Sequence, residues 1–160
     1  MRCVYCQNYD ISPFPESGLP YSTDQMAKRI EHMYRDGPVG PVGRSRRIRN
    51  VNWVGGDPTP HIPFVLGALE RCSVPLPQVW NSNMYLSRQG MRLLEGTMDI
   101  YLTDLKYGND ECARRLSGID DYFQTVTRNH LLAQDQAEVI VRHLVLPGHL
   151  ECCTFPVLDW

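Results

Sequence analysis

The feature that most limits the fold of this chain is a regular alternation of short apolar runs with amphipathic segments. The apolar runs cover residues 48–54, 78–80, 99–104 and 138–146. Two of them contain three apolar residues in succession, as strands do when both faces of their sheet are covered. Strands that alternate with helices predict parallel βαβ units with right-handed crossovers. We therefore predict an α/β protein.

The amphipathic segments carry recognisable helix ends. Ser22, with Gln25 three residues later, forms a capping-box pattern. Thr59 followed by Pro60 predicts an N-cap and a first helical position, for a helix that reaches about residue 72. The other predicted helices begin at Ser87, Asn109 and Asp120, and the last of them reaches about residue 134.

Length and composition place these elements in one domain. The chain has 160 residues, within the roughly 100–200 of a typical domain, so we treat residues 1–160 as one unit. Sixteen Lys and Arg against eighteen Asp and Glu give a net charge of −2. The chain therefore lacks the excess of basic residues that is typical of a nucleic-acid-binding protein. The longest apolar stretch, residues 62–69, is much shorter than the roughly 20 residues that span a membrane. The N-terminus shows no secretory signal, so we expect a cytoplasmic protein.

One segment departs from the alternation. Residues 37–50 read GPVGPVGRSRRIRN, with a short GPV repeat and four arginines within six residues. Glycine, proline and charge favour solvent over packing, so we interpret this segment as a surface insertion between a helix and a strand. An arm that binds phosphate or a partner protein is the alternative.

Polar and glycine-rich residues gather at the carboxyl ends of the predicted strands. In parallel α/β sheets these ends meet at one edge, where ligands bind. Glycines let a backbone come close to a ligand, and a carboxylate can hold a cationic amino group. A plain strand-to-helix turn and a simple ion pair are the alternatives that remain open. The residues concerned are Gly55, Gly56, Asp57, Pro58 and Thr59 after the first strand, Asn81, Ser82 and Asn83 after the second, Asp104 and Lys106 after the third, and Arg142 within the fourth.

The cysteines are too unevenly spread for a disulfide framework, but Cys3 and Cys6 form a CxxC pair. In a reducing compartment such a pair is typically a metal or redox element, because both thiols can reach one centre. The other four are expected to pack as small buried apolar side chains: Cys72, Cys112, Cys152 and Cys153.

Taken together, these motifs resemble those of radical S-adenosylmethionine (SAM) proteins. CVYCQN, GGDPT, NSN, DIYLTDLKYG and VRHLVLPG occur in this order, and the resemblance covers nearly the whole chain outside residues 37–50. The most similar group comprises uncharacterised relatives of the pyruvate formate-lyase activating enzyme. The resemblance implies a partial parallel (β/α) barrel that lacks its first strand, in a domain that we expect to be incomplete at both ends.

This resemblance also implies a 4Fe–4S cluster held by a CxxxCxxC loop, with SAM bound at the open iron. Cys3 and Cys6 would be the second and third ligands, and Tyr5 would pack near the adenine. The first ligand would lie upstream of Met1, and a cluster that lacks one thiolate should be labile. By similarity the GGDPT segment, with Asp in place of the family's Glu, and the other strand-end residues named above would line the SAM site.

The implied activity is that of an oxidoreductase. It is the reductive cleavage of SAM to a 5′-deoxyadenosyl radical, which abstracts hydrogen from a substrate. A flavodoxin- or ferredoxin-like protein would donate the electron, and a glycyl-radical enzyme is one candidate protein substrate. One alternative is a zinc-binding or thiol-redox module, in which Cys3 and Cys6 bind Zn²⁺ with Cys152, Cys153 or His149. Another is a remnant that cannot assemble the cluster.

Overall fold

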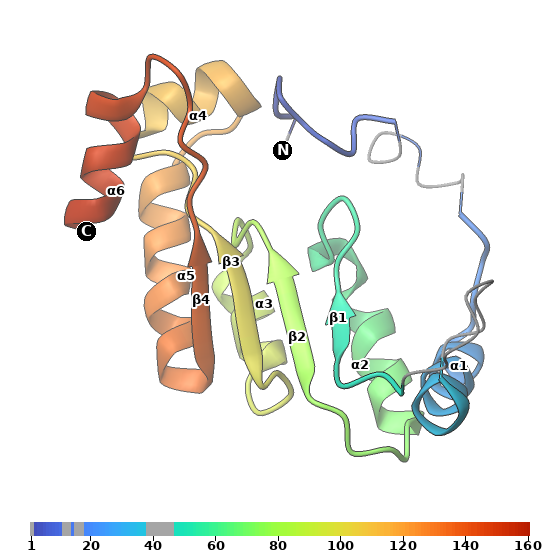
Figure 1. The fold of residues 1–160 in the computed structure, drawn as a ribbon. Coiled ribbons are helices and arrows are strands. Elements are labelled where there is room, and N and C mark those ends of the chain that lie inside the picture. The colour runs from blue at the N-terminus through green and yellow to red at the C-terminus, as the bar shows by residue number, and fades with distance from the viewer. Residues whose placement is uncertain (1, 11–13, 15–17, 38–46) are drawn as a thin grey trace.

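The computed structural model describes residues 2–10, 14, 18–37 and 47–160. Among these residues lies a four-stranded parallel sheet in the order β1-β2-β3-β4. The strands are β1 (Val51–Trp53), β2 (Gln78–Ser82), β3 (Ile100–Asp104) and β4 (Glu138–Arg142). The predicted α/β fold is confirmed. The described sheet is open, with β1 and β4 at its edges, as in a partial (β/α) barrel (Figure 1).

Helices connect successive strands and cover one face of the sheet. Figure 1 shows α2, α3 and α5 behind the sheet, and the strands all point with their carboxyl ends toward the N-terminal segment. The helical elements are α1 (Thr23–Asp36), η2 (Thr59–His61), α2 (Ile62–Arg71), α3 (Arg88–Leu94), α4 (Asp110–Ser117), α5 (Tyr122–Gln136), η3 (Leu150–Thr154) and α6 (Phe155–Asp159).

The two faces of the sheet differ in burial. Trp53, Trp80 and Tyr101 are register neighbours on β1, β2 and β3, and all three are buried in the core. Side chains alternate along a strand, so Leu102 and Ile140 lie on the opposite face, where Ile140 is 46% exposed. This second, more open face also carries Asn81, Asp104 and Arg142 near the strand ends.

Several predicted strand ends are wrong, because a strand extends only as far as it pairs with its neighbouring strand. The first strand is shorter than residues 48–54, because β2 begins at Gln78, the register partner of Val51. The fourth strand ends at Arg142 and not at residue 146, because its partner Asp104 is the last residue of β3. β2 in turn extends to Ser82, so part of the NSN segment lies inside the strand.

The predicted helix starts are partly confirmed. Thr59 is not an N-cap: it begins a short 3-10 turn and donates its amide to the Asp57 carboxylate at 3.0 Å, while α2 starts at Ile62. Asp120 is one residue early, since Asp121 is the N-cap of α5 in a left-handed conformation with φ 48°. The confirmed N-caps are Ser22, Ser87 and Asn109.

Some predictions fall where the structure gives little information. Most of the predicted insertion at residues 37–50 lies outside the described residues, which include only 37 and 47–50 of it. The assignment of residues 1–160 to one domain stays a prediction. None of the described helices has the length and apolar character needed to cross a lipid bilayer.

Candidate functional site

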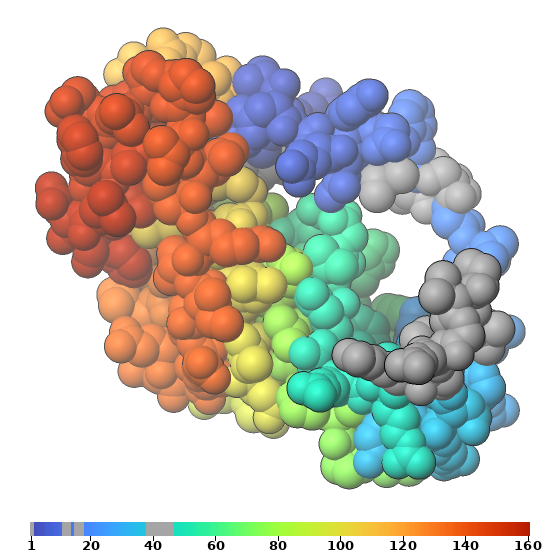
Figure 2. All heavy atoms as spheres, viewed as in Figure 1, coloured from blue at the N-terminus to red at the C-terminus, as the bar shows by residue number. Residues whose placement is uncertain are grey.

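The N-terminal segment lies across the carboxyl edge of the sheet (Figure 1). The Cys6 amide donates to the Cys3 carbonyl at 3.1 Å, which folds the CxxC pair into one tight turn. Backbone amides on either side of Cys3 donate to carbonyls at the end of α4. Further along, the Asn8 side-chain amide donates to the Gly55 carbonyl at 3.4 Å. The segment therefore bridges α4 and the loop after β1, beside the orange and red C-terminal part of the chain (Figure 2).

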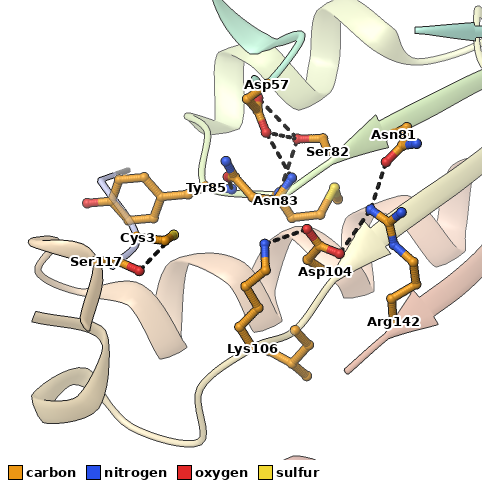
Figure 3. A network of polar contacts seen from close by, with 12 residues as sticks. Cys3, Asp57, Asn81, Ser82, Asn83, Tyr85, Asp104, Lys106, Ser117 and Arg142 are labelled. Carbon is orange, nitrogen blue, oxygen red and sulfur yellow. Dashed lines mark hydrogen bonds and ion pairs between the residues drawn. The ribbon is translucent and has the colours of Figure 1, made fainter. Parts of the chain in front are cut away.

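A chain of hydroxyl groups ends at the sulfur of Cys3. The buried Ser117 hydroxyl donates to Cys3 Sγ at 2.9 Å (Figure 3). Ser117 also bonds the Tyr107 hydroxyl, which in turn bonds the Tyr5 hydroxyl. Burial raises the pKa of both phenols above the ordinary tyrosine value, so both remain protonated at neutral pH. A hydroxyl donor at this position can hydrogen-bond to a metal-bound cysteine sulfur, and such outer contacts orient and tune the ligands of a metal site.

Asp57 joins the loop after β1 to the end of β2. Its Oδ1 accepts the Thr59 amide at 3.0 Å. Its Oδ2 accepts the Asn83 amide at 2.8 Å and the Ser82 hydroxyl at 3.1 Å (Figure 3). A carboxylate offers about four acceptor positions. The described donors fill three of them. Asp57 therefore links the loop after β1 to the end of β2, and it can accept about one further hydrogen bond from an external donor.

Removing the Asp57 carboxylate should destabilise the protein. In Asp57→Ala the Thr59 and Asn83 amides and the Ser82 hydroxyl lose their charged acceptor. We expect the free energy of unfolding to fall by about 2–3 kcal/mol, since hydrogen bonds to charged groups contribute about 1.5–3 kcal/mol each and this site is only half-buried. Urea unfolding followed by circular dichroism measures the change. Asp135→Ala, on the exposed face of α5, is the control, and equal losses in both variants would contradict the assignment.

A second polar network lies on the open face of the sheet. Asp104 contacts Lys106 Nζ at 2.6 Å through one oxygen and the Arg142 guanidinium at 2.9 Å through the other. The same guanidinium donates to Asn81 Oδ1 at 2.7 Å. Strand register explains the grouping, because Asp104 is directly opposite Arg142. One carboxylate and two cations leave a formal charge of +1, which suits an anionic ligand group.

The NSN segment divides between these two networks. Asn81 and Ser82 are adjacent on β2, so their side chains point to opposite faces of the sheet. Asn81 therefore meets Arg142, whereas Ser82 and Asn83 bind Asp57. Figure 3 shows both networks and Cys3 around the same end of the sheet.

The glycine-rich loop after β1 contacts a side chain of the N-terminal segment. Gly55 has φ 152°, a conformation that residues with side chains rarely adopt, and its carbonyl accepts the Asn8 side chain. Gly56 is exposed and Pro58 is buried. The space beside Gly55 is open, since a Cβ atom there would meet nothing within 4 Å. Contact of this loop with a cofactor stays a prediction.

Comparison with known proteins identifies the family. A sequence profile described as the Radical SAM superfamily matches residues 1–154. The chain belongs to the radical SAM superfamily. An uncharacterised protein of Methanocaldococcus jannaschii is 48% identical over 165 aligned positions, which cover 99% of this chain and 45% of that protein. The chain therefore spans less than half the length of this relative. Membership of the radical SAM superfamily implies an iron–sulfur cluster and SAM as cofactors.

The described donor groups fit these radical SAM cofactors. Thiolates hold iron–sulfur clusters, and hydrogen bonds to their sulfurs tune them. The turn of Cys3 and Cys6 supplies two thiols and the Ser117 donor. SAM carries an ammonium and a carboxylate group. These groups match the acceptor position left on Asp57 and the positive network around Asp104.

Two sets of residues in this radical SAM chain were not predicted from the sequence. Asn129 of α5 is fully buried and donates to the carbonyls of Met84 and Leu86 at 2.8 and 2.9 Å, which fixes the turn after Asn83. Asparagine is unfavourable inside helices, so its position within a predicted helix could have marked Asn129 as a residue with a specific hydrogen-bonding role. The second set is a cluster of three of the later cysteines with a histidine: Cys112, His149, Cys152 and Cys153. Cys112 and Cys153 are buried, as predicted, but their sulfurs also lie beside other ligand atoms. Among the described residues this cluster does not include Cys3 or Cys6, which the zinc alternative joined to some of the same side chains.

Proposed function

We propose that the chain is the cofactor-binding part of a radical SAM enzyme similar to the pyruvate formate-lyase activating enzyme. A 4Fe–4S cluster and SAM, when bound, supply reductive cleavage of SAM and a radical that abstracts hydrogen from a substrate. The position of the CxxC turn carries this proposal. Hydrogen bonds hold the turn at both ends, at the same end of the sheet as Asp57 and Asp104 (Figure 3).

Each network has a distinct part in this proposal. Cys3 and Cys6 hold iron, with the family's remaining thiolate expected four residues before Cys3. The Ser117 hydroxyl stabilises the charge on Cys3 Sγ. Lys106 and Arg142 attract the SAM carboxylate, and Asp57 accepts its ammonium group. The remaining predicted lining residues are Tyr5, Gly55, Gly56, Pro58, Thr59, Asn81, Ser82, Asn83 and Asp104.

The partners follow from the same chemistry. Reductive cleavage needs a low-potential electron, which we assign to a flavodoxin- or ferredoxin-like donor. A glycyl-radical enzyme is the proposed protein substrate, and the cytoplasm, where thiols stay reduced, is the proposed location.

Anaerobic reconstitution tests the proposal. The full-length natural protein, including any coding residues upstream of Met1, is incubated with iron and sulfide, reduced with dithionite and supplied with SAM. We expect an iron–sulfur absorption spectrum and the formation of 5′-deoxyadenosine, measured by liquid chromatography and mass spectrometry. Cys3→Ser and Cys6→Ser should each reduce the product by at least about 100-fold, because thiolates are the ligands that hold such clusters.

Cys72→Ser is the matched control, because Cys72 follows α2 away from the N-terminal turn. Its product yield should equal that of the wild type. Wild-type yield in Cys6→Ser would overturn the assignment of the ligands. Zinc bound through Cys3 and Cys6, with no iron–sulfur spectrum, would support the zinc alternative.

A further inference from the structure

We infer that Cys112, His149, Cys152 and Cys153 form a structural zinc site, separate from the CxxC turn. Among the described residues, their ligand atoms all lie within 4.8 Å of one another. Cys112 lies on α4, His149 immediately precedes η3, and the other two cysteines lie within η3. The site does not depend on the proposed radical activity.

The distances from Cys152 Sγ to the other three ligand atoms, and the distance between Cys112 and His149, match a single tetrahedral ion. With Zn–S bonds of about 2.3 Å, the sulfurs of a tetrahedral site lie about 3.8 Å apart, and a sulfur and a histidine nitrogen about 3.6 Å apart. The Sγ atom of Cys152 lies 3.6 Å from that of Cys112 and 3.8 Å from that of Cys153. The Nδ1 atom of His149 lies 3.6 Å from Cys112 Sγ and 3.2 Å from Cys152 Sγ. Three cysteines and one histidine are a common ligand set for structural zinc.

Hydrogen bonds hold the backbone of these ligands in place. Asn109 caps α4 by accepting the Cys112 amide at 2.8 Å, and its side-chain amide donates to the Cys152 carbonyl at 2.6 Å. One asparagine thus fixes both ligand-bearing segments. The Cys153 amide also donates to the His149 carbonyl at 3.0 Å. Such outer contacts orient ligands before a metal arrives.

Burial and charge also suit a metal centre. Cys112 is 5% and Cys153 1% exposed, so three thiolates without a cation would be costly there. Three thiolates, a neutral imidazole and Zn²⁺ give a net charge of −1, and the guanidinium of Arg115 lies nearby, 3.3 Å from His149 Nε2. Binding zinc through Nδ1 leaves a proton on Nε2. The exposed Arg115 side chain must then turn away from that nitrogen, which its exposure allows.

The zinc site joins the C-terminal segment of the described chain to α4. The end of α4 carries Ser117, which holds Cys3, so zinc also steadies the helix on which the N-terminal turn rests. A single ion fits better than an iron–sulfur cluster, because a cluster of several irons lies between its thiolates and needs them farther apart.

Metal analysis of the full chain tests this inference. Protein purified under reducing conditions and loaded with ZnSO₄ is desalted and analysed by mass spectrometry for metals. We expect one tightly held zinc ion per chain. Cobalt substitution should give the charge-transfer and ligand-field bands of tetrahedral thiolate coordination. Cys112→Ser and Cys152→Ser should weaken zinc binding by more than about 100-fold, because the loss of a ligand exceeds the 10–100-fold effect of an outer contact.

The Cys3→Ser/Cys6→Ser double variant is the control that separates this site from the proposed cluster. It should keep its zinc even though it loses iron. Alkylation of the wild type needs no variant: zinc should protect the half-buried Cys152 from iodoacetamide, and leave Cys72, which is also half-buried, as reactive as before. Absence of protection would overturn the inference, as would zinc lost only in the double variant. A Cys112–Cys152 disulfide in place of bound zinc would overturn it too.

Discussion

Asn129→Asp is expected to lower the free energy of unfolding by about 3 kcal/mol, because a carboxylate oxygen would replace a buried donor. Asn129 is 0% exposed, and its Nδ2 lies 2.8 Å from the Met84 carbonyl and 2.9 Å from the Leu86 carbonyl. Aspartate has the same shape, so the variant would place three oxygens against one another. Arg128 donates to the other side-chain oxygen and compensates only part of this cost.

The effect should reach the candidate site. Met84 adopts a left-handed conformation with φ 58°, which Asn129 stabilises from the core. The same turn presents the Asn83 amide to Asp57. A variant that remains folded is therefore expected to bind SAM more weakly as well.

Guanidinium unfolding measures the loss of stability, and equilibrium dialysis with labelled SAM measures binding by the reconstituted full-length protein. Asn50→Asp introduces the same chemical change at an exposed position and is the control. We expect the control to keep the wild-type free energy of unfolding within about 0.5 kcal/mol. Equal midpoints for the two variants would contradict the role given to Asn129.

Local patterns were sufficient to predict much of the fold. The capping box of Ser22 and Gln25 involves residues three apart, and the structure contains both of its hydrogen bonds. The apolar runs likewise specify strands without knowledge of their neighbours. Strand ends were less predictable, because β4 stops at Arg142 where β3 offers no further partner.

The site was predicted as a set of positions but not as a set of contacts. The rule that parallel strands end at one edge placed Asp57, Asn83 and Asp104 together. Which donor meets which acceptor depends on loop geometry and register, and neither can be read from adjacent residues. The thiol cluster shows the same limit, since Cys112 and Cys152 are 40 residues apart and meet only when η3 packs on α4.

The second large effect is expected for Gly108→Ala, in the loop that leads from β3 to α4. Gly108 does not have a left-handed φ, so alanine can adopt its backbone conformation, and the obstacle is space alone. A Cβ atom there would lie 2.8 Å from Pro156 Cβ, 2.9 Å from the Cys153 carbonyl oxygen and 3.0 Å from the Cys152 carbonyl oxygen. Backbone atoms cannot rotate away as a flexible side chain does. We therefore expect η3 and α6 to be displaced, at a cost of about 2–3 kcal/mol in the free energy of unfolding.

This displacement should also weaken the proposed zinc site, although Gly108 is not a ligand. Moving η3 separates Cys152 from Cys112, so zinc affinity and stability should fall together when measured by chelator competition and by thermal unfolding. Gly18→Ala is the control, because a Cβ atom at Gly18 meets nothing within 4 Å. Wild-type stability in Gly108→Ala would show that η3 packs more loosely on this loop than the contacts indicate. Lowered stability with unchanged zinc affinity would instead mean that the ligands move as one body with η3 and α4, since only a change in the distance between the two segments alters the tetrahedron.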